Sequence, residues 1–329
     1  MSSTPPPATT DFAPIAGFWR RIAAFLVDGL ILALIGHGLG LVLFDLFVRL
    51  GPWGRGLGLL VALVYFVPQE SVRSGQSLGK RLLRIRVVDA QGRSLGMVRG
   101  AGRFAVFGVP YFLNGAALPM DVLMFAGGVP FALLVVGGLL ALAYLLAFNR
   151  RTRQSLHDLA VGSFVVRAGP RDAPAPARVW RGHLVVAGAL ALLAGAAPLA
   201  YPWLMSIPPF ATLRALDERL AAQPELRSVG VSTASTRVYG VHSDSRPIQE
   251  LRIDATIARP PVDDVALSTR LAGIALASWP DAKLQDHIAV RLAYGFDIGI
   301  ASSWDANMLS LAPDQWADRV AAGVGGASN

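Results

Sequence analysis

Long apolar runs alternate with short polar stretches over the first 206 of the 329 residues of this chain. A transmembrane helix needs about 20 mostly apolar residues to cross a hydrocarbon core of about 30 Å. Runs of this kind predict membrane-spanning helices at residues 22–44, 57–69, 104–119, 122–148 and 184–206. After residue 206 the pattern changes to shorter amphipathic segments, which predict a separate water-soluble domain.

The pattern within the last segment, 207–329, predicts an α+β domain. ATLRALDERLAAQ and PVDDVALSTRLAGIALASWP have helical periodicity. ELRSVGVSTASTRVYGV, IQELRIDATIA and HIAVRLAYGFDIGIASSW are typical of strands, and a closing stretch near NMLSLAPDQWADRV completes the pattern. The order helix, strand, strand, helix, strand, strand predicts helices on one face of an antiparallel sheet. At about 120 residues, this domain is large enough to have a core of its own.

The composition supports a membrane protein and excludes several kinds of chemistry. The chain is 53% hydrophobic and 16% charged, and its mean hydropathy is +0.48. It has no cysteine, which excludes disulfides, iron–sulfur clusters, thiolate zinc sites and cysteine nucleophiles. The N-terminus lacks a basic region and a cleavage site, so we expect the first apolar helix to remain attached as an anchor.

The distribution of charge predicts the membrane topology. Residues 1–206 carry 19 Lys and Arg against 8 Asp and Glu, whereas residues 207–329 carry 11 against 14. Basic residues beside membrane spans follow the positive-inside rule, so the net charge of +8 indicates topology rather than nucleic-acid binding. With the N-terminus in the cytoplasm, four spans before residue 150 place 17 of the 19 basic residues inside. A three-span alternative would expel seven of them and is rejected.

These observations divide the chain into five parts. A disordered, proline-rich N-terminus (1–16) precedes a four-helix membrane domain (17–167), in which a turn around Leu118, Pro119 and Asp121 joins the third and fourth spans. LLRIRVVDAQGRSLGMV predicts two short strands, and AVGSFVVRA predicts another, so we expect a small cytoplasmic sheet. A cytoplasmic linker (168–183) and a fifth span (184–206) lead to the domain at 207–329, which this topology places in the periplasm. The predicted fold class is thus an all-α membrane bundle of four spans plus a fifth, with small β elements, followed by a soluble α+β domain.

Two charges in the first apolar helix are the main candidates for chemistry. Asp28 lies seven residues beyond Arg21, on the same helix face and about 10 Å deeper. That distance is too long for direct pairing, and a carboxylate so deep in a membrane is costly without a partner. The segment QSLHD places His157 and Asp158 near the same cytoplasmic edge. We therefore expect Arg21 to contact Asp158, and Asp28 to meet polar atoms of a neighbouring helix or water.

The segments GFWRRIAAFLVD, GQSLGKRLLRIRVVDAQG and RQSLHDLAVGSFVV, in this order, resemble the RDD family of bacterial membrane proteins. The resemblance covers residues 15–167, and matching the family's arginine and two aspartates gives Arg21, Asp28 and Asp158. It implies a multi-span helical domain, with monovalent cation and proton exchange suggested for some members. The fifth span and the domain at 207–329 lie outside this pattern.

GQSLGKR superficially resembles a phosphate-binding loop. It has three residues rather than four between its glycines, and Arg81 stands where Ser or Thr should bind Mg²⁺. A turn that begins a basic amphipathic helix is the better interpretation, with Lys80, Arg81 and Arg84 facing lipid headgroups or the cytoplasm. His37 is a weak candidate for a proton path from Asp28, since it is better explained as a polar residue near the outer interface.

Two functions remain open from the sequence. In the first, the inner-membrane bundle moves a monovalent cation or proton, with Asp28 as the exchanging carboxylate and Arg21, Asp158 and His157 as its polar network. In the second, the same polar contacts only fasten helices together, and the bundle is a scaffold for a periplasmic interaction or sensory domain with an unknown protein partner. The domain at 207–329 has no HExxH or GxSxG motif, so neither an enzyme nor a cofactor or metal site is expected. Beyond these candidates, the expected partner is the lipid bilayer.

Overall fold

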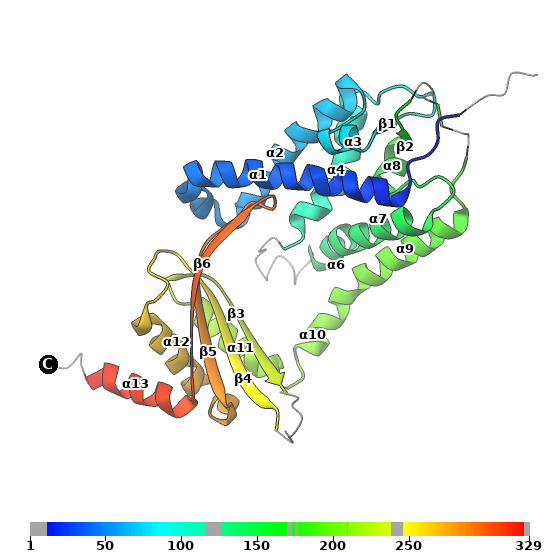
Figure 1. Ribbon diagram of the computed structural model, residues 1–329. Coiled ribbons are helices and arrows are strands. Elements are labelled where there is room, and N and C mark those ends of the chain that lie inside the picture. Colours follow the sequence, from blue (N-terminus) through cyan, green and yellow to red (C-terminus); the bar gives the residue numbers. More distant parts are fainter. Residues whose placement is uncertain are drawn as a thin grey trace, which may run out of the picture. The chain divides into compact units, whose positions relative to one another are not determined.

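The computed structural model describes residues 12–115, 127–169, 173–174, 177–208, 210–237 and 246–325 (Figure 1). The chain divides into two compact units. The first unit consists of Met1–Leu199 together with the six residues Asp297–Ser302, and the second consists of Ala200–Phe296 and Ser303–Asn329. Each unit has its own architecture and is described separately.

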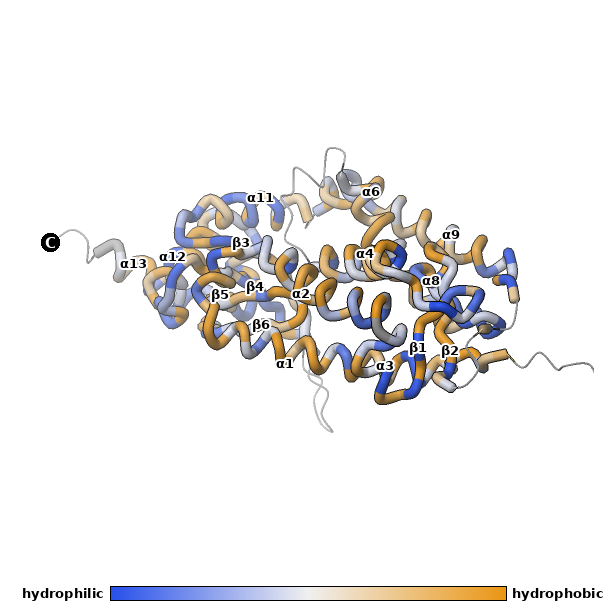
Figure 2. The backbone as a smooth tube through the Cα atoms, turned by 90° about the horizontal axis from the view of Figure 1, so that it is seen from above, coloured by the Kyte–Doolittle hydropathy of each residue, from blue (hydrophilic) through white to orange (hydrophobic). Residues whose placement is uncertain are grey.

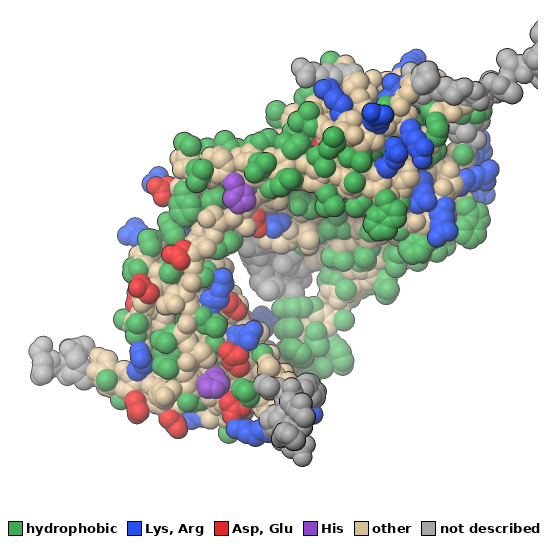
Figure 3. Space-filling model, in the orientation of Figure 1, with side chains coloured by type: hydrophobic (Ala, Val, Ile, Leu, Met, Phe, Trp, Pro, Cys, Tyr) green, Lys and Arg blue, Asp and Glu red, His purple; other side chains and the backbone are tan. Residues whose placement is uncertain are grey.

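The first unit, called the membrane unit below, is built from helices. Its described elements in chain order are α1 (Phe18–Leu50), η1 (Gly51–Trp53), α2 (Gly54–Pro68), the π-helical turn η2 (Gln69–Arg73), α3 (Leu78–Leu82), α4 (Met97–Leu113), α6 (Gly128–Ala132), the π-helical turn η4 (Leu133–Gly137), α7 (Gly138–Phe148), α8 (Leu156–Val161), α9 (Arg181–Ala196) and η5 (Ala197–Ala200). Hydrophobic residues predominate along α1 and α2 (Figure 2). On the face shown in Figure 3, Lys and Arg gather over the end where α1 begins, and apolar side chains cover much of the rest of α1.

Among the described residues, three helical stretches are long and apolar enough to cross a membrane: Phe18–Val72, Gly128–Phe148 and Arg181–Leu204. The first contains the predicted spans 22–44 and 57–69, and the other two correspond to 122–148 and 184–206. The predicted span 104–119 is represented by α4, which has 17 residues and begins seven residues earlier than expected. The predicted turn around Leu118, Pro119 and Asp121 lies outside the described residues. The count of four spans plus one therefore stays a prediction.

A two-stranded sheet joins two distant parts of the membrane unit. Strand β1 (Ile85–Val88) pairs in antiparallel fashion with β2 (Phe164–Arg167), so that Ile85 lies opposite Arg167. Most of the apolar side chains of both strands are buried. The predicted small sheet is confirmed, but the second strand predicted in RSLGMV is wrong. Gly96, with a φ of 76°, precedes the first turn of α4, and the chain becomes helical at Met97 instead.

The second unit begins with α10 (Tyr201–Leu204) and is an α+β fold. Its elements are α11 (Phe210–Ala221), β3 (Leu226–Thr236), β4 (Ile248–Ile257), α12 (Val265–Ser278), η6 (Pro280–Leu284), β5 (His287–Asp297), β6 (Ser302–Leu311) and α13 (Pro313–Gly325). The sheet order is β3-β4-β5-β6. Its core combines apolar residues of α11, α12 and the strands with Trp316, whose indole nitrogen donates to the carbonyl of Ile288 at 2.9 Å.

The prediction of a purely antiparallel sheet is wrong for one pair of strands. Strands β3 and β4 are antiparallel, whereas β4 and β5 are parallel. The physical reason is the connection: α12 carries the chain back along the sheet, and parallel strands need such a crossover. The sheet is therefore mixed.

The segment Asp297–Ser302 runs from the last residue of β5 to the first residue of β6 but is packed within the membrane unit. The guanidinium of Arg55 donates to the Asp297 carboxylate from Nε at 3.1 Å and from Nη2 at 2.7 Å. Ile300 packs against an apolar cluster formed by α1, α2 and α4. A Cβ at Gly58 would overlap the carbonyl oxygen of Ile298, so this close approach requires glycine. No sequence pattern predicted that this segment belongs to the membrane unit.

Candidate functional site

Arg21 and Asp158 form an ion pair, as expected from the sequence. Arg21 lies one turn into α1, and its Nη2 donates to Oδ2 of Asp158 at 2.5 Å. The same guanidinium also donates to the carbonyl of Arg153, in the loop between α7 and α8. The side chain of Arg21 is 8% exposed and that of Asp158 is fully buried. The pair thus joins the beginning of α1 to α8.

Asp158 also organises its own helix. The backbone N–H of Ser155 donates to its carboxylate at 3.2 Å, which forms a capping box at the beginning of α8. The hydroxyl of Ser163 lies 3.2 Å from the other carboxylate oxygen. Burial alone would raise the pKa of Asp158, but the nearby guanidinium groups of Arg21 and Arg103 hold it well below 3.8. Asp158 is therefore a charged, multiply bonded carboxylate.

Arg103 and Glu70 extend this ion pair into a chain of charges that sequence reasoning missed. Arg103 donates to Oδ1 of Asp158 from Nε at 3.0 Å and from Nη2 at 2.8 Å. Its Nη1 donates to Glu70 at 2.6 Å, and the other oxygen of Glu70 accepts from Lys80 at 2.5 Å. All three of these side chains are largely buried. The chain of pairs connects α8, α4, η2 and α3.

Asp28 contacts polar atoms of a neighbouring helix, which is one of the two environments that the sequence predicted for it. Its carboxylate accepts hydrogen bonds from the hydroxyl of Tyr65 on α2 at 2.7 Å, from the hydroxyl of Ser77 at 2.6 Å and from the N–H of Gly79 at 2.8 Å. The ammonium of Lys80 is 4.0 Å away. Asp28 is fully buried. With three donors and a cation around it, this carboxylate is well satisfied.

We call the six charged residues of this region the charge network. It consists of three carboxylates and three cations: Asp28, Glu70, Asp158, Arg21, Lys80 and Arg103. These charges balance, so the network as a whole places no uncompensated charge inside the protein.

The structure places Lys80 inside the charge network and not on a surface that faces lipid headgroups or the cytoplasm. Its ammonium lies in the charge network and over the ring of Phe66, 5.3 Å from the ring centroid. The hydroxyl of Ser77 caps the N-terminus of α3, and this turn points Lys80 inward. Arg81 and Arg84 are exposed, in keeping with the surface position expected for them. His37 is also exposed and bonds to the carbonyl of Ala33, so it is turned toward its own helix.

The glycines of GQSLGKR allow two elements to approach closely. A Cβ at Gly79 would overlap the carbonyl oxygen of Ala24 and lie 2.9 Å from Cγ of Asp28. Gly75 has a φ of 71° and faces the backbone of Val87. The segment therefore seats the first turn of α3 on Asp28 of α1, which explains the glycines without a phosphate ligand.

His157 lies beside the charge network in its neutral form. Its Nε2 is 3.4 Å from Oδ1 of Asp158. Burial lowers its pKa from 6.5 to about 3, an effect that Asp158 opposes and that Arg103 and Arg21 reinforce. His157 is therefore uncharged at neutral pH.

This buried histidine predicts that stability falls on acidification. Between pH 6.5 and 3 the unfolded chain binds a proton at residue 157 that the folded chain does not, so stability decreases as the pH is lowered. We expect a loss of about 2 kcal/mol from pH 7 to pH 5, which His157→Gln should remove. The measurement is SDS unfolding of both proteins in mixed micelles at pH 7, 6 and 5. An unchanged pH slope in the variant would contradict the assignment.

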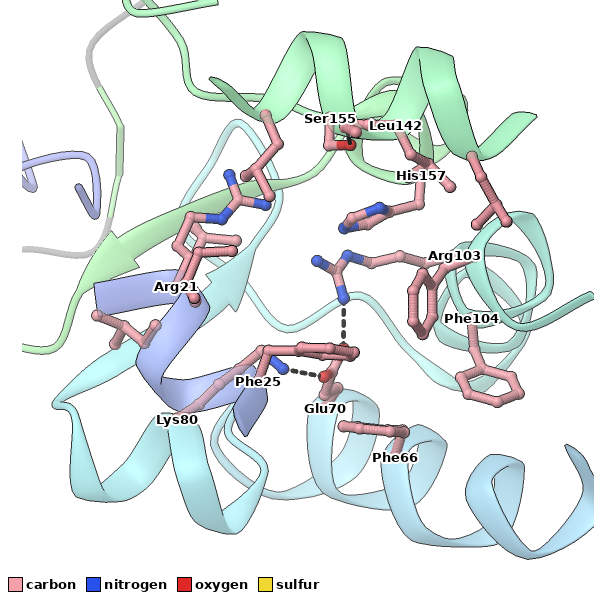
Figure 4. A pocket seen from close by; sticks show the side chains of 17 residues that line it. Arg21, Phe25, Phe66, Glu70, Lys80, Arg103, Phe104, Leu142, Ser155 and His157 are labelled. Carbon is pink, nitrogen blue, oxygen red and sulfur yellow. Dashed lines mark hydrogen bonds and ion pairs between the residues drawn. The ribbon is translucent and has the colours of Figure 1, made fainter. Parts of the chain in front are cut away.

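A cavity of about 280 Å³ lies next to the charge network (Figure 4). We call it the Arg21 cavity. Its polar lining comes from Arg21, Glu70, Lys80, Arg103, Ser155 and His157. The rest is apolar and comes mainly from α1, α4 and α7, with Phe25, Phe66, Phe104, Phe107, Leu139, Leu142, Ala143 and Leu146 among the lining residues. Asp28 is not one of the residues that line it.

The apolar helices and the buried charge network together define a helical membrane protein fastened by ion pairs at one end of its bundle. Residues 15–162 match the model of the RDD family, which confirms the predicted resemblance, and this matched part is called the RDD domain below. The uncharacterized protein YckC of Bacillus subtilis (strain 168) is similar: it is 28% identical over 157 residues, which cover 48% of this chain and 87% of YckC. No solved structure matches the chain significantly. Helix α9 and the second unit lie beyond the matched residues.

Proposed function

We propose that the RDD domain is a membrane scaffold in which the arginine and both aspartates fasten helices together. The observation that carries this proposal is the environment of Asp28. It is fully buried, it accepts from three donors, and it does not line the Arg21 cavity. An exchanging carboxylate needs a route to water, and the described residues around Asp28 provide structural partners instead.

The scaffold carries the α+β domain, for which we propose an interaction or sensory role without enzymatic activity. Two features support an anchoring function. The apolar stretch Arg181–Leu204 leads directly into the second unit, and Asp297–Ser302 is packed within the membrane unit. The charge distribution along the sequence favours a cytoplasmic N-terminus in a bacterial inner membrane and a periplasmic C-terminal domain.

One observation favours a second function, the movement of a monovalent cation or proton. Glu70 lines the Arg21 cavity and is shared between Lys80 and Arg103. If the protein exchanges ions, this carboxylate is better placed than Asp28 to do so. The transport hypothesis therefore moves from Asp28 to Glu70.

Proteoliposomes test the two functions in one experiment. Cation-dependent proton flux is measured with a pH-sensitive dye for the wild type, Asp28→Asn and Glu70→Gln, with Na⁺, K⁺ and Li⁺ in turn. The scaffold predicts no flux above that of empty vesicles for any protein, and a lower unfolding midpoint for Asp28→Asn. Flux in the wild type that Asp28→Asn abolishes, with its unfolding midpoint unchanged, would contradict the scaffold. Flux lost only in Glu70→Gln would establish the second function.

A further inference from the structure

The lining of the Arg21 cavity combines charged and apolar side chains. Arg21 on α1 and Arg103 on α4 both line it, and both side chains are 8% exposed. Lys80 and Glu70 also line it, and Glu70 lies between Lys80 and Arg103 (Figure 4). Phenylalanine and aliphatic side chains line the remainder. Such a lining suits an amphiphile rather than a hydrated ion.

The order of the lining residues along the helices matches the orientation of a lipid. On α1, Phe25 follows Arg21 by one turn, about 6 Å further from the beginning of the helix. On α4, Phe107 follows Arg103 in the same way. Helix α7 runs in the opposite sense, since its last residue is followed by the loop whose Arg153 carbonyl accepts from Arg21. Charge therefore lies toward the helix ends, where headgroups are found, and Phe25 and Phe107 lie one turn deeper.

The charges on the lining favour an anionic headgroup. Three lining side chains are cationic and one is a carboxylate, while His157 is neutral. The carboxylates of Asp28 and Asp158 compensate the remaining positive charge of the network, but they do not line the cavity. An anion in the cavity thus meets a surface with an excess of positive charge, at a depth where electrostatic interactions are weakly screened.

His157 adds a second requirement on the headgroup. Its Nε2 faces the Asp158 carboxylate at 3.4 Å, and a carboxylate only accepts, so this nitrogen is the one that carries the proton. The other nitrogen, Nδ1, is then an acceptor, and it is buried with no hydrogen-bond partner among the described residues. A hydroxyl on the ligand would satisfy it.

We propose that the Arg21 cavity binds one anionic phospholipid with a hydroxylated headgroup, of the phosphatidylglycerol type, from the leaflet at the Arg21 end of α1. The phosphate lies by Arg21 and Arg103, and a headgroup hydroxyl donates to Nδ1 of His157. The first carbons of an acyl chain follow Phe25 and Phe107, and the rest of the lipid lies in the bilayer, because about 280 Å³ is too small for a whole phospholipid. This site is separate from the exposed Arg81 and Arg84, and it goes beyond the scaffold function.

Native mass spectrometry of the full chain in detergent tests this site. The protein is titrated with phosphatidylglycerol, with phosphatidylcholine, and with phosphatidylmethanol, which has the same charge but no headgroup hydroxyl. We expect one phosphatidylglycerol to bind at least tenfold more tightly than phosphatidylcholine, and more tightly than phosphatidylmethanol. Equal binding of phosphatidylcholine would overturn the proposal. Displacement of the lipid by millimolar inorganic phosphate would also overturn it, because the ligand would then be a free anion.

Two variants on α7 locate the bound lipid. Ala143→Trp places a large side chain at a residue that lines the Arg21 cavity and is not itself part of the charge network, whereas Leu140→Trp places the same side chain at a residue that is 43% exposed and does not line the cavity. We expect Ala143→Trp to weaken phosphatidylglycerol binding at least tenfold and Leu140→Trp to change it less than twofold. Equal effects of the two variants would overturn the site. If Ala143→Trp does not fold, His157→Phe decides instead: it should abolish the preference for phosphatidylglycerol over phosphatidylmethanol, and an unchanged preference would overturn the proposal.

Discussion

Asp158→Ala is expected to destabilise the membrane unit by about 3–5 kcal/mol, because it leaves two buried guanidinium groups without their common carboxylate. Arg21 and Arg103 both donate to Asp158, and neither can reach water easily because each side chain is 8% exposed. The substitution also removes the carboxylate of the α8 capping box. Its effect should therefore exceed that of any exposed ion pair in the chain.

The measurement for Asp158→Ala is equilibrium unfolding by SDS in mixed micelles, followed by circular dichroism. Asp45→Ala is the matched control, since Asp45 is an exposed aspartate on α1. We expect the control to change the free energy of unfolding by less than about 0.5 kcal/mol. Similar midpoints for the two variants would mean that Asp158 does not hold the helices together.

Gly79→Ala is expected to cost about 3 kcal/mol although it adds only one methyl group. That methyl would overlap the carbonyl oxygen of Ala24, which belongs to the backbone of α1 and cannot turn away. Helix α3 would have to move, and the hydrogen bonds from Gly79 and Ser77 to Asp28 would lengthen with it. The expected result is a lower unfolding midpoint, although all six residues of the charge network are still present.

Gly38→Ala is the matched control for Gly79→Ala. Gly38 also lies in the membrane unit, on α1, but a Cβ there would meet no atom within 4 Å. Alanine is the better helix former, so the control should be neutral or slightly stabilising, by up to about 1 kcal/mol. A neutral Gly79→Ala would show that α3 does not need its close contact with α1.

The helices of the membrane unit were largely predictable because their signal is local. The apolar run at 22–44 falls within α1 and most of the run at 184–206 falls within the stretch Arg181–Leu204, since an apolar sequence of this length has few alternatives in a bilayer. The contact of Arg21 with Asp158 was predictable because the predicted topology places both residues near the same cytoplasmic edge of the bundle. Alternation in two short segments predicted the strands β1 and β2 and a small sheet, whereas their pairing and register come from the structure.

Arg103 and Glu70 were not predictable, because nothing in their local sequence distinguishes them from surface charges. Arg103 belongs to a run of arginines that the positive-inside rule already explains. It is buried only because α4 begins at Met97, before the predicted apolar span, and this earlier beginning carries Arg103 into the bundle. Glu70 was the one acidic residue near the end of the second predicted span, and this isolation is a signal that could have been used.

The parallel pair β4–β5 and the packing of Asp297–Ser302 were missed for a different reason. Both depend on contacts between residues far apart in the sequence, which hydrophobic periodicity does not encode. The sequence signal for a crossover was α12 itself, because a helix of this length between two strands can connect parallel neighbours. No comparable signal marks Asp297–Ser302, since Arg55 and Asp297 are 242 residues apart.

A double-mutant cycle between Arg21 and Asp158 tests most directly whether the charge network holds the helices together. The unfolding free energies of the wild type, Arg21→Gln, Asp158→Asn and the double variant are measured by SDS titration at one pH. The scaffold predicts a coupling energy of about 1.5–3 kcal/mol. Either single substitution removes one charge of the pair and leaves the other buried without compensation, whereas the double variant removes both. A coupling energy near zero would contradict it and would show that the two residues contribute independently.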